Sequence, residues 1–263
     1  MNEPLLAGTT GGVLRLTLNN PQARNSLSRS MMAALHGAIK AAADDSAIRV
    51  IVIAANGPAF CAGHDLKEVT AHRADADKGR AYFEALMADC SALMQAIVNC
   101  PLPVIAEVQA VASAAGCQLV ASCDLAIASE DARFQTPGVN IGLFCSTPMV
   151  ALSRNISRKA AMEMLLTGDA IDATEAIRIG LVNRVVAAPA LSAEVAALAK
   201  SIASKPASTV KIGKQAFYRQ LEMPLAEAYA YAADVMTENL LARNSQEGIG
   251  AFIAKRPPDW RGH

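Results

Sequence analysis

The stretch from Ala106 to Asp124, AEVQAVASAAGCQLVASCD, places an apolar, strand-like run directly before a helical run, with only small residues between them. Ala114, Ala115 and Gly116 form this junction, so the backbone N–H groups at the helix start are open to approach from outside the sheet. The dipoles of such groups favour negative charge. The sequence therefore predicts an oxyanion site where this strand passes into a helix.

Short branched strands alternate with helical segments along the chain, which indicates an α/β fold. From Leu221 to Arg256 the apolar positions are too many for one face of an isolated helix, so we expect this part to pack on a neighbouring subunit as well. A stripe that includes Tyr82, Leu86 and Ile97 is expected in the core. The expected strands are Val13–Leu18, Arg49–Ala54, Asp124–Ala128, Arg133–Thr136 and Leu181–Val186. Two long helices are expected, one capped by Ser26 or Ser28 and reaching Asp44, and one from Asp75 to Asn99.

Composition excludes several classes of protein. Hydrophobic residues make up 52% of the 263 residues. However, polar residues such as Asn56 and Glu107 interrupt the apolar runs well short of the roughly 20 residues that a membrane span needs. The formal net charge is +0, no basic stripe is present, and aromatic residues make up only 4%. We therefore expect neither a membrane nor a nucleic-acid partner.

Six cysteines lie in apolar surroundings without a CxxC pair, which predicts reduced, buried thiols. The N-terminus MNEPLLAGTTGG lacks the basic and apolar pattern of an export signal, so a cytoplasmic protein is expected. The four histidines have no ligand spacing with a cysteine or an acidic partner, and no metal site is predicted.

A second junction has the same design. The buried strand that ends at Ala54 leads into ANGPAFCAGHDLKE, in which small residues precede a polar cluster. The small residues are Cys61, Ala62 and Gly63. The cluster itself consists of His64, Asp65, Lys67 and Glu68.

With both junctions in view, the sequence resembles the enoyl-CoA hydratase/isomerase, or crotonase, superfamily. The matching strings are NNPQARNSLS, GPAFCAGHDLKE, AAGCQLVASCDLAIASEDARFQTPGVNIGLF, TGDAIDATEAIRIGLVNRVV and SQEGIGAFIAKRPPDW, in the family's order. The resemblance implies a crotonase-like spiral of ββα units over residues 1–200 and a helical trimerisation region over 201–263. It also implies a homotrimer or a dimer of trimers.

The family holds the thioester oxygen of an acyl-CoA on two backbone N–H groups, and these positions match His64 and Ala115. Coenzyme A would enter as part of the substrate, and no separate cofactor is implied. Phe252 and Lys255 match positions that reach the coenzyme A of a neighbouring subunit. The remaining positions that match the family's coenzyme A contacts are Ala23, Arg24, Ser26, Ala62, Asp65, Leu66 and Lys67.

Two positions depart from the family's pattern. Family hydratases use two glutamates, one a helical turn after the second oxyanion donor and one directly after a loop proline. Gln118 stands at the first position, and Gly138, after Pro137, stands at the second. An amide does not exchange a proton at neutral pH and glycine has no side chain, so we expect weak or absent hydratase activity.

Other chemistry stays open. The ring of His64 could face the acyl group, because the string AGHD also resembles decarboxylating members of the superfamily. A protein that binds acyl-CoA without turnover is a second alternative. Cys145, in the loop that should border the acyl group, is expected to be a buried structural thiol. A serine nucleophile at Ser113 is disfavoured, because no histidine lies where a related protease branch of the fold keeps it, in the segment that follows Asp124.

Overall fold

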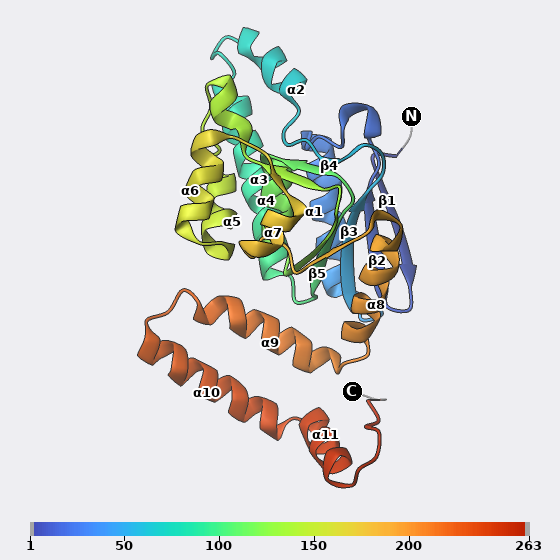
Figure 1. Cartoon of the computed structure of the whole chain (residues 1–263). Helices are drawn as coiled ribbons and strands as arrows, with labels where there is room; N and C mark the ends of the chain where they lie inside the picture. The colour runs from blue at the N-terminus through green and yellow to red at the C-terminus, as the bar shows by residue number, and fades with distance from the viewer. Residues whose placement is uncertain (1–2, 261–263) are drawn as a thin grey trace.

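Two β-sheets form the centre of the molecule and helices cover them (Figure 1). The computed structural model describes residues 3–260. Its strands are β1 Leu5–Thr10, β2 Val13–Leu18, β3 Val50–Ala55, β4 Ala59–Cys61, β5 Val104–Val108, β6 Val111–Ser113, β7 Leu125–Ser129, β8 Arg133–Gln135, β9 Ile171–Asp172 and β10 Arg184–Val186. The larger sheet has the order β1-β2-β3-β5-β7-β10, and the smaller has the order β4-β6-β8-β9.

A repeated step builds a spiral from these strands. A strand of the larger sheet is followed by a strand of the smaller sheet and then by a helix, first through β3 and β4, next through β5 and β6, and then through β7 and β8. β3, β5 and β7 pair in parallel, and so do β4, β6 and β8. The carboxyl ends of three strands of the smaller sheet therefore lie at one edge.

The helices cover the sheets and extend below them in Figure 1. Of the two candidate caps, Ser28 caps α1 by accepting a hydrogen bond from the Met31 N–H at 3.1 Å. The helices are α1 Arg29–Asp44, α2 Leu66–Ala71, α3 Arg80–Asn99, α4 Ala115–Ser122, α5 Pro148–Asn155, α6 Arg158–Thr167, α7 Ala173–Arg178, α8 Leu191–Ala203, α9 Ala207–Gln220, α10 Leu225–Leu241 and α11 Arg243–Ile253.

Between residues 3 and 260, α3 is the one helix long and apolar enough to cross a membrane by length and composition. In the fold it packs against α1 and α4, and its residues Leu86, Cys90, Leu93 and Ile97 are buried. Its apolar stripe is therefore part of the protein core, as the helical spacing predicted.

The C-terminal helices α9, α10 and α11 lie apart from the sheets in Figure 1. No residue of α9 is buried, and of α10 only Ala228 is. One polar cluster joins α9 to the core: the Lys214 ammonium donates to Asp124 Oδ2 at 2.6 Å and to the carbonyls of Ile97 and Leu102 at 3.0 and 2.9 Å. The Tyr218 hydroxyl donates to the other oxygen of Asp124 at 2.9 Å.

Several predicted boundaries are wrong. The expected helix from Asp75 begins instead at Arg80, because Gly79 before it has a left-handed φ of 85°. The expected strand from Leu181 is reduced to β10, since the Leu181 N–H closes a turn on the Ala176 carbonyl. The helical part after Leu221 is broken at Ala242, whose backbone is extended.

The sequence analysis also missed three strands. β1 and β9 were not predicted, and β4 lies inside the segment that was expected to be a loop. The stretch Ala106–Asp124 contains the end of β5 and all of β6, which belong to different sheets. Strands of three residues, such as β4 and β6, are too short to show an alternating pattern.

Candidate functional site

Three loops leave neighbouring strand ends at the carboxyl edge of the smaller sheet. β4 leads into 62–64, β6 into Ala114 and Ala115, and β8 into 136–138. The two junctions predicted from the sequence therefore lie side by side, together with the loop that carries Gly138.

The first two loops touch at Gly63. A Cβ atom on Gly63 would lie 3.0 Å from Ala114 Cβ, 3.0 Å from the Ser113 carbonyl and 3.3 Å from the Ala115 nitrogen. Its φ of +93° is also a left-handed value that favours glycine. Only glycine allows this approach, which places the residue after it, His64, beside the start of α4.

The start of α4 is held by equally close contacts. Ala114 has φ 50° and ψ −116°, which is a strained conformation for a residue with a side chain. Its N–H is fixed by a 2.9 Å hydrogen bond to the Gln135 carbonyl on β8. A Cβ on Gly116 would lie only 2.1 Å from the Cys61 carbonyl oxygen, so α4 and the end of β4 meet backbone to backbone.

The backbone N–H groups of His64 and Ala115 are both free. Within residues 3–260, neither group donates a hydrogen bond. Ala115 is the first residue of its helix, where an N–H has no intrahelical partner, and it is only 1% exposed. The site therefore offers two neighbouring main-chain donors to an acceptor from outside the chain.

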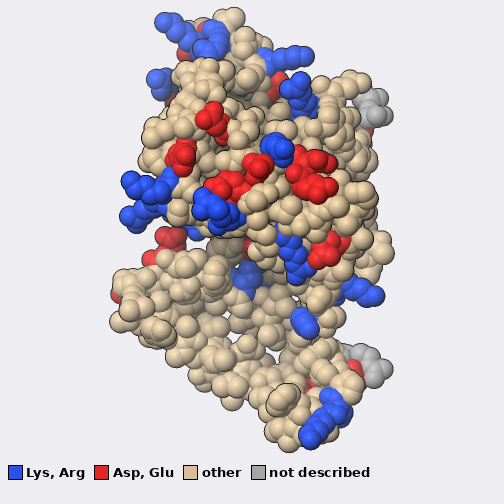
Figure 2. Space-filling view, in the orientation of Figure 1, with Lys and Arg blue, Asp and Glu red and all other residues tan. Residues whose placement is uncertain are grey.

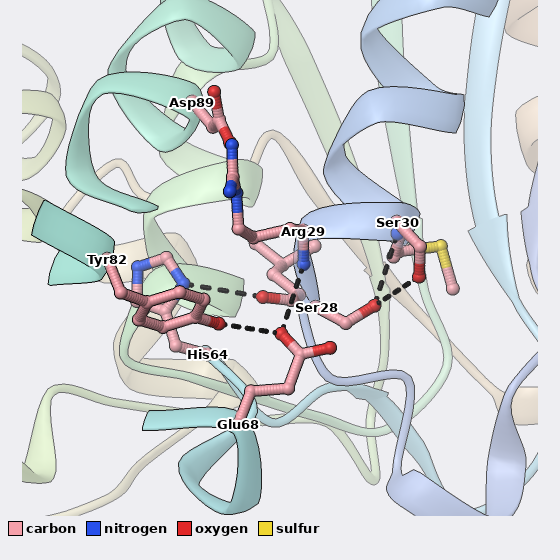
Figure 3. A network of polar contacts seen from close by, with 9 residues as sticks. Ser28, Arg29, Ser30, His64, Glu68, Tyr82 and Asp89 are labelled. Carbon is pink, nitrogen blue, oxygen red and sulfur yellow. Dashed lines mark hydrogen bonds and ion pairs between the residues drawn. The ribbon is translucent and has the colours of Figure 1, made fainter. Parts of the chain in front are cut away.

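The ring of His64 has one partnered nitrogen and one without a partner. Nδ1 lies 3.4 Å from the Leu27 carbonyl oxygen (Figure 3), while Nε2 is buried and has no hydrogen-bond partner among the described residues. Burial lowers the pKa of this imidazole, and the contact with Leu27 opposes that shift. His64 therefore favours the neutral form.

The residues predicted to hold coenzyme A are mostly gathered beside this junction. The Leu27 N–H donates to the Gly63 carbonyl at 2.7 Å, and the Ala62 N–H donates to the Arg24 carbonyl at 3.0 Å. These bonds join the loop of Ala23, Arg24 and Ser26 to the loop that carries Leu66 and Lys67, and the side chains of Arg24, Leu66 and Lys67 are exposed.

Asp65 connects the same two loops through its side chain. Ser26 Oγ donates to Asp65 Oδ2 at 3.2 Å, and Asp65 Oδ1 accepts from the Lys67 N–H at 2.9 Å and from the Glu68 N–H at 3.4 Å. The last two bonds cap α2.

Phe252 and Lys255 do not join the site within their own chain. Phe252 belongs to α11 and is 85% exposed, and Lys255 follows directly after that helix. In Figure 1, α11 lies at the opposite end of the molecule from α2. A role for either residue at this site therefore requires a second copy of the chain.

The two positions that lack glutamates differ in the space around them. Gln118 is 4% exposed, and Cys90 Sγ donates to its Oε1 at 3.8 Å. At Gly138 a Cβ would lie 2.8 Å from the Leu143 carbonyl oxygen and 2.9 Å from Cys145 Sγ. Gln118 thus occupies a place that a glutamate would fit, whereas Gly138 is closed in by its own loop.

The thiol of Cys145 is buried, as predicted, and burial raises its pKa. All six cysteines are free and buried, which confirms that part of the sequence analysis. Ser113 Oγ accepts a hydrogen bond from Gln135 Nε2 at 3.2 Å. This amide partner is not a base that could activate a serine nucleophile.

One polar contact near the site was not predicted. Tyr82, which was expected to be a core residue, donates its hydroxyl to Glu68 Oε2 at 3.0 Å, and the Arg29 N–H donates to the same oxygen at 3.3 Å (Figure 3). The Tyr82 ring also stacks on His72 with 3.7 Å between centroids. These contacts fix α2 against α1 and α3, and burial together with Glu68 raises the pKa of Tyr82 to about 12.

A spiral of paired strands, with close-packed loops at the carboxyl edge of the smaller sheet, defines a protein of the crotonase class. A sequence model of the enoyl-CoA hydratase/isomerase family matches residues 8–263. The chain belongs to this family.

Individual relatives agree with this assignment. The enoyl-CoA hydratase domain-containing protein 3 of Rattus norvegicus is 48% identical over 261 residues, which cover 98% of this chain and 85% of the rat protein. The structure of an enoyl-CoA hydratase from Mycobacterium smegmatis is 52% identical, covers 98% of this chain and 99% of its own, and superposes with a TM-score of 0.94.

The structure of human enoyl-CoA hydratase domain-containing protein 3 is also similar. It is 46% identical, covers 98% of this chain and 100% of its own, and has a TM-score of 0.93. The strings AAGCQLVASCD and TPGVNIGLFCSTP of this chain resemble that group in particular, and these relatives confirm the likeness.

The predicted cytoplasmic location is wrong by the same comparison. The rat, mouse and human relatives, which are 47 to 48% identical to this chain, are all named as mitochondrial proteins. The prediction rested on an N-terminal segment without an export signal, and such a segment does not distinguish between compartments inside the cell.

Proposed function

We propose that this protein binds an acyl-CoA thioester and stabilises the enolate form of its acyl group on the N–H groups of His64 and Ala115. The observation that carries the proposal is that these two N–H groups are free and are brought together by the contact at Gly63. Each donor of such a pair typically contributes about 3 kcal/mol when it is preorganised for developing negative charge.

Hydration of an enoyl-CoA is proposed to be weak or absent. Addition of water needs groups that move its protons, and the amide of Gln118 cannot do so. A side chain at position 138 would collide with Leu143 and Cys145, so that loop offers no carboxylate either. We therefore place the protein in acyl-CoA metabolism as a binder of thioester enolates.

The coenzyme A moiety is proposed to lie along the joined loops of Arg24, Ser26, Asp65 and Lys67. In an assembled homotrimer or dimer of trimers, Phe252 and Lys255 of a neighbouring copy would complete this surface. The exposed apolar side chains of α10 and α11 support such an assembly, because single chains seldom leave so much apolar surface in water.

Calorimetric titration with butyryl-CoA and with free coenzyme A tests the binding proposal. We expect butyryl-CoA to bind more tightly, because free coenzyme A has no thioester oxygen for the two donors. Gly63→Ala should reduce this difference by about tenfold or more, which is about 1.4 kcal/mol. The matched control is Gly37→Ala in α1, where a Cβ meets nothing within 4 Å.

An assay with crotonyl-CoA tests the expected lack of hydration. The absorbance of the conjugated enoyl thioester should fall only very slowly, even at high enzyme concentration. Rapid hydration would contradict the proposal that Gln118 and Gly138 disable this step. If neither butyryl-CoA nor crotonyl-CoA bound to the protein, the assignment of the site itself would be contradicted.

A further inference from the structure

The buried Nε2 atom of His64 is a polar group that the rest of the chain leaves unused. This nitrogen is buried from solvent, and among the described residues it has no hydrogen-bond partner. Leaving such a nitrogen unsatisfied costs about 1–3 kcal/mol, so its presence calls for an explanation. The nitrogen belongs to the same residue as one of the two free backbone donors.

The environment fixes which form of the ring is present. The Leu27 carbonyl can only accept, so its 3.4 Å contact with Nδ1 requires that Nδ1 carries the hydrogen. In the neutral ring, Nε2 then holds a lone pair and no proton. The lowered pKa of His64 keeps this form dominant near neutral pH. Nε2 is therefore an acceptor, directed away from Leu27.

We propose that His64 Nε2 is the catalytic base of this site and accepts the α proton of the bound acyl-CoA. This inference rests on the proposed function, since the backbone donors of His64 and Ala115 must first hold the thioester oxygen. That oxygen would lie about 2.9 Å from the His64 nitrogen. The α carbon is bonded to the same carbonyl carbon, so the step requires the ring of His64 to face that carbon when the thioester is held.

The proposed step is balanced without another reactant. The α C–H bond breaks, its proton forms a bond to Nε2, and its electron pair forms the carbon–carbon double bond of the enolate. The carbonyl electrons move onto the oxygen, which the two N–H groups stabilise. When the proton on Nε2 exchanges with solvent and returns, the acyl-CoA is regenerated with a solvent hydrogen at its α carbon.

This step gives His64 the role that neither Gln118 nor Gly138 can fill. The amide of Gln118 is not a base, and Gly138 has no room for one. Asp65 and Glu68 are the nearest carboxylates along the chain, but both oxygens of Asp65 and Oε2 of Glu68 accept hydrogen bonds that hold α2 and its neighbours. Among these groups, Nε2 is the one basic nitrogen, and it accepts no hydrogen bond within the described residues.

Deuterium exchange into saturated acyl-CoA esters tests the proposal. Full-length protein is incubated in D2O with acetyl-, butyryl- or octanoyl-CoA, and mass spectrometry measures deuterium at the α carbon. These esters cannot be hydrated, so the measurement isolates proton transfer. We expect exchange by the wild-type protein and a loss of about 10²- to 10⁴-fold in His64→Asn, which is the usual contribution of a general base.

His64→Asn keeps the backbone donor and a side-chain N–H near Leu27, so binding of butyryl-CoA should change by less than about threefold. The matched control is His36→Asn on α1, which should exchange at the wild-type rate. His64→Gln is a second variant that also lacks a basic nitrogen, and it serves if the asparagine variant does not fold.

Two results would overturn the inference while the binding proposal stands. One is wild-type protein that binds butyryl-CoA but incorporates no deuterium from any of the three esters. The other is a folded His64→Asn or His64→Gln variant that exchanges as fast as wild type. Absence of acyl-CoA binding by the wild-type protein would instead remove the proposed function, and this inference with it.

Discussion

The spiral core and the C-terminal helices are packed in opposite ways. In the core, backbones meet so closely that Gly63 and Gly116 have no room for a methyl group. In α10 and α11, large apolar side chains remain in solvent, with Leu225 75% and Phe252 85% exposed. Figure 2 shows the same contrast, because the lower part of the molecule, where these helices lie, carries few charges.

This difference in packing separates the placing of the candidate site from the covering of exposed apolar surface. The core holds the candidate site with its own backbone and needs no partner to place the donors of His64 and Ala115. The C-terminal helices expose apolar surface of a kind that subunit contacts usually cover. Lys214 and Asp124 form the polar connection between the two regions.

The largest expected effect comes from adding a methyl group in the core. Gly116→Ala should destabilise the protein by more than about 4 kcal/mol, because the new Cβ would lie 2.1 Å from the rigid Cys61 carbonyl. Urea unfolding measures the change. Gly213→Ala in α9, where the Cβ meets nothing within 4 Å, should instead stabilise by about 0.5–1 kcal/mol. Equal changes in the free energy of unfolding at the two positions would contradict the difference in packing between the core and the C-terminal helices.

The connection between the regions should have the next largest effect. Lys214→Gln leaves the carboxylate of Asp124 without its cation, and the two side chains are only 7% and 16% exposed. Loss of one partner of a buried pair costs about 3–5 kcal/mol. Thermal unfolding of this variant should be compared with that of Lys211→Gln, an exposed lysine of the same helix. A Tm equal to that of the control would show that α9 is held mainly by other contacts.

Glutamates placed at positions 118 and 138 should not produce an efficient hydratase, because the core leaves too little space at position 138. Gly138→Glu is expected to cost about 1–3 kcal/mol, because its side chain must displace the loop of Leu143 and Cys145. Gln118→Glu should fold, since the two side chains are similar in size. Crotonyl-CoA hydration by the double variant should stay low. Efficient hydration would mean that the loop moves aside at little cost.

The smallest expected effects are two pH dependences, one in each region. The pKa of His64 in the folded protein lies below its ordinary value of 6.5. Its favourable contribution to the free energy of unfolding is therefore complete above pH 6.5 and is lost as the pH falls below that value. The hydrogen bond from Arg256 lowers the pKa of Glu247 from 4.5 to about 2 in the folded protein. The contribution of Glu247 to the free energy of unfolding is therefore lost only as the pH falls from 4.5 to about 2.

Unfolding free energies at several pH values can separate these two groups. His64→Asn should flatten the pH dependence just below 6.5 and leave the acid range unchanged. Glu247→Gln should do the reverse, with its change confined to pH values below 4.5. A variant that altered the other group's range would show that the two regions titrate together.

The sequence predicted the backbone part of the site better than its surroundings. The small residues at Gly63 and Ala114–Gly116 are local signals, and both junctions were found from them. Gly138 was recognised as a position without the expected acid, but the contact that closes it comes from Cys145, later in the same loop. The cluster of Asp124 with Lys214 joins residues 90 positions apart. Both contacts depend on the folded path of the chain, and no local sequence pattern predicts them.

The contact at Gly63 also determines what mutational scanning can detect. The two donors of the site are main-chain atoms, so replacing the side chain of His64 removes the ring and leaves the donor in place. Ala115 is already alanine, and an alanine scan would pass over it. Proline is the one residue that deletes a backbone N–H. If the proposed site is correct, sensitivity should therefore appear at the neighbours Gly63 and Gly116, whose close contacts hold the two N–H groups in position.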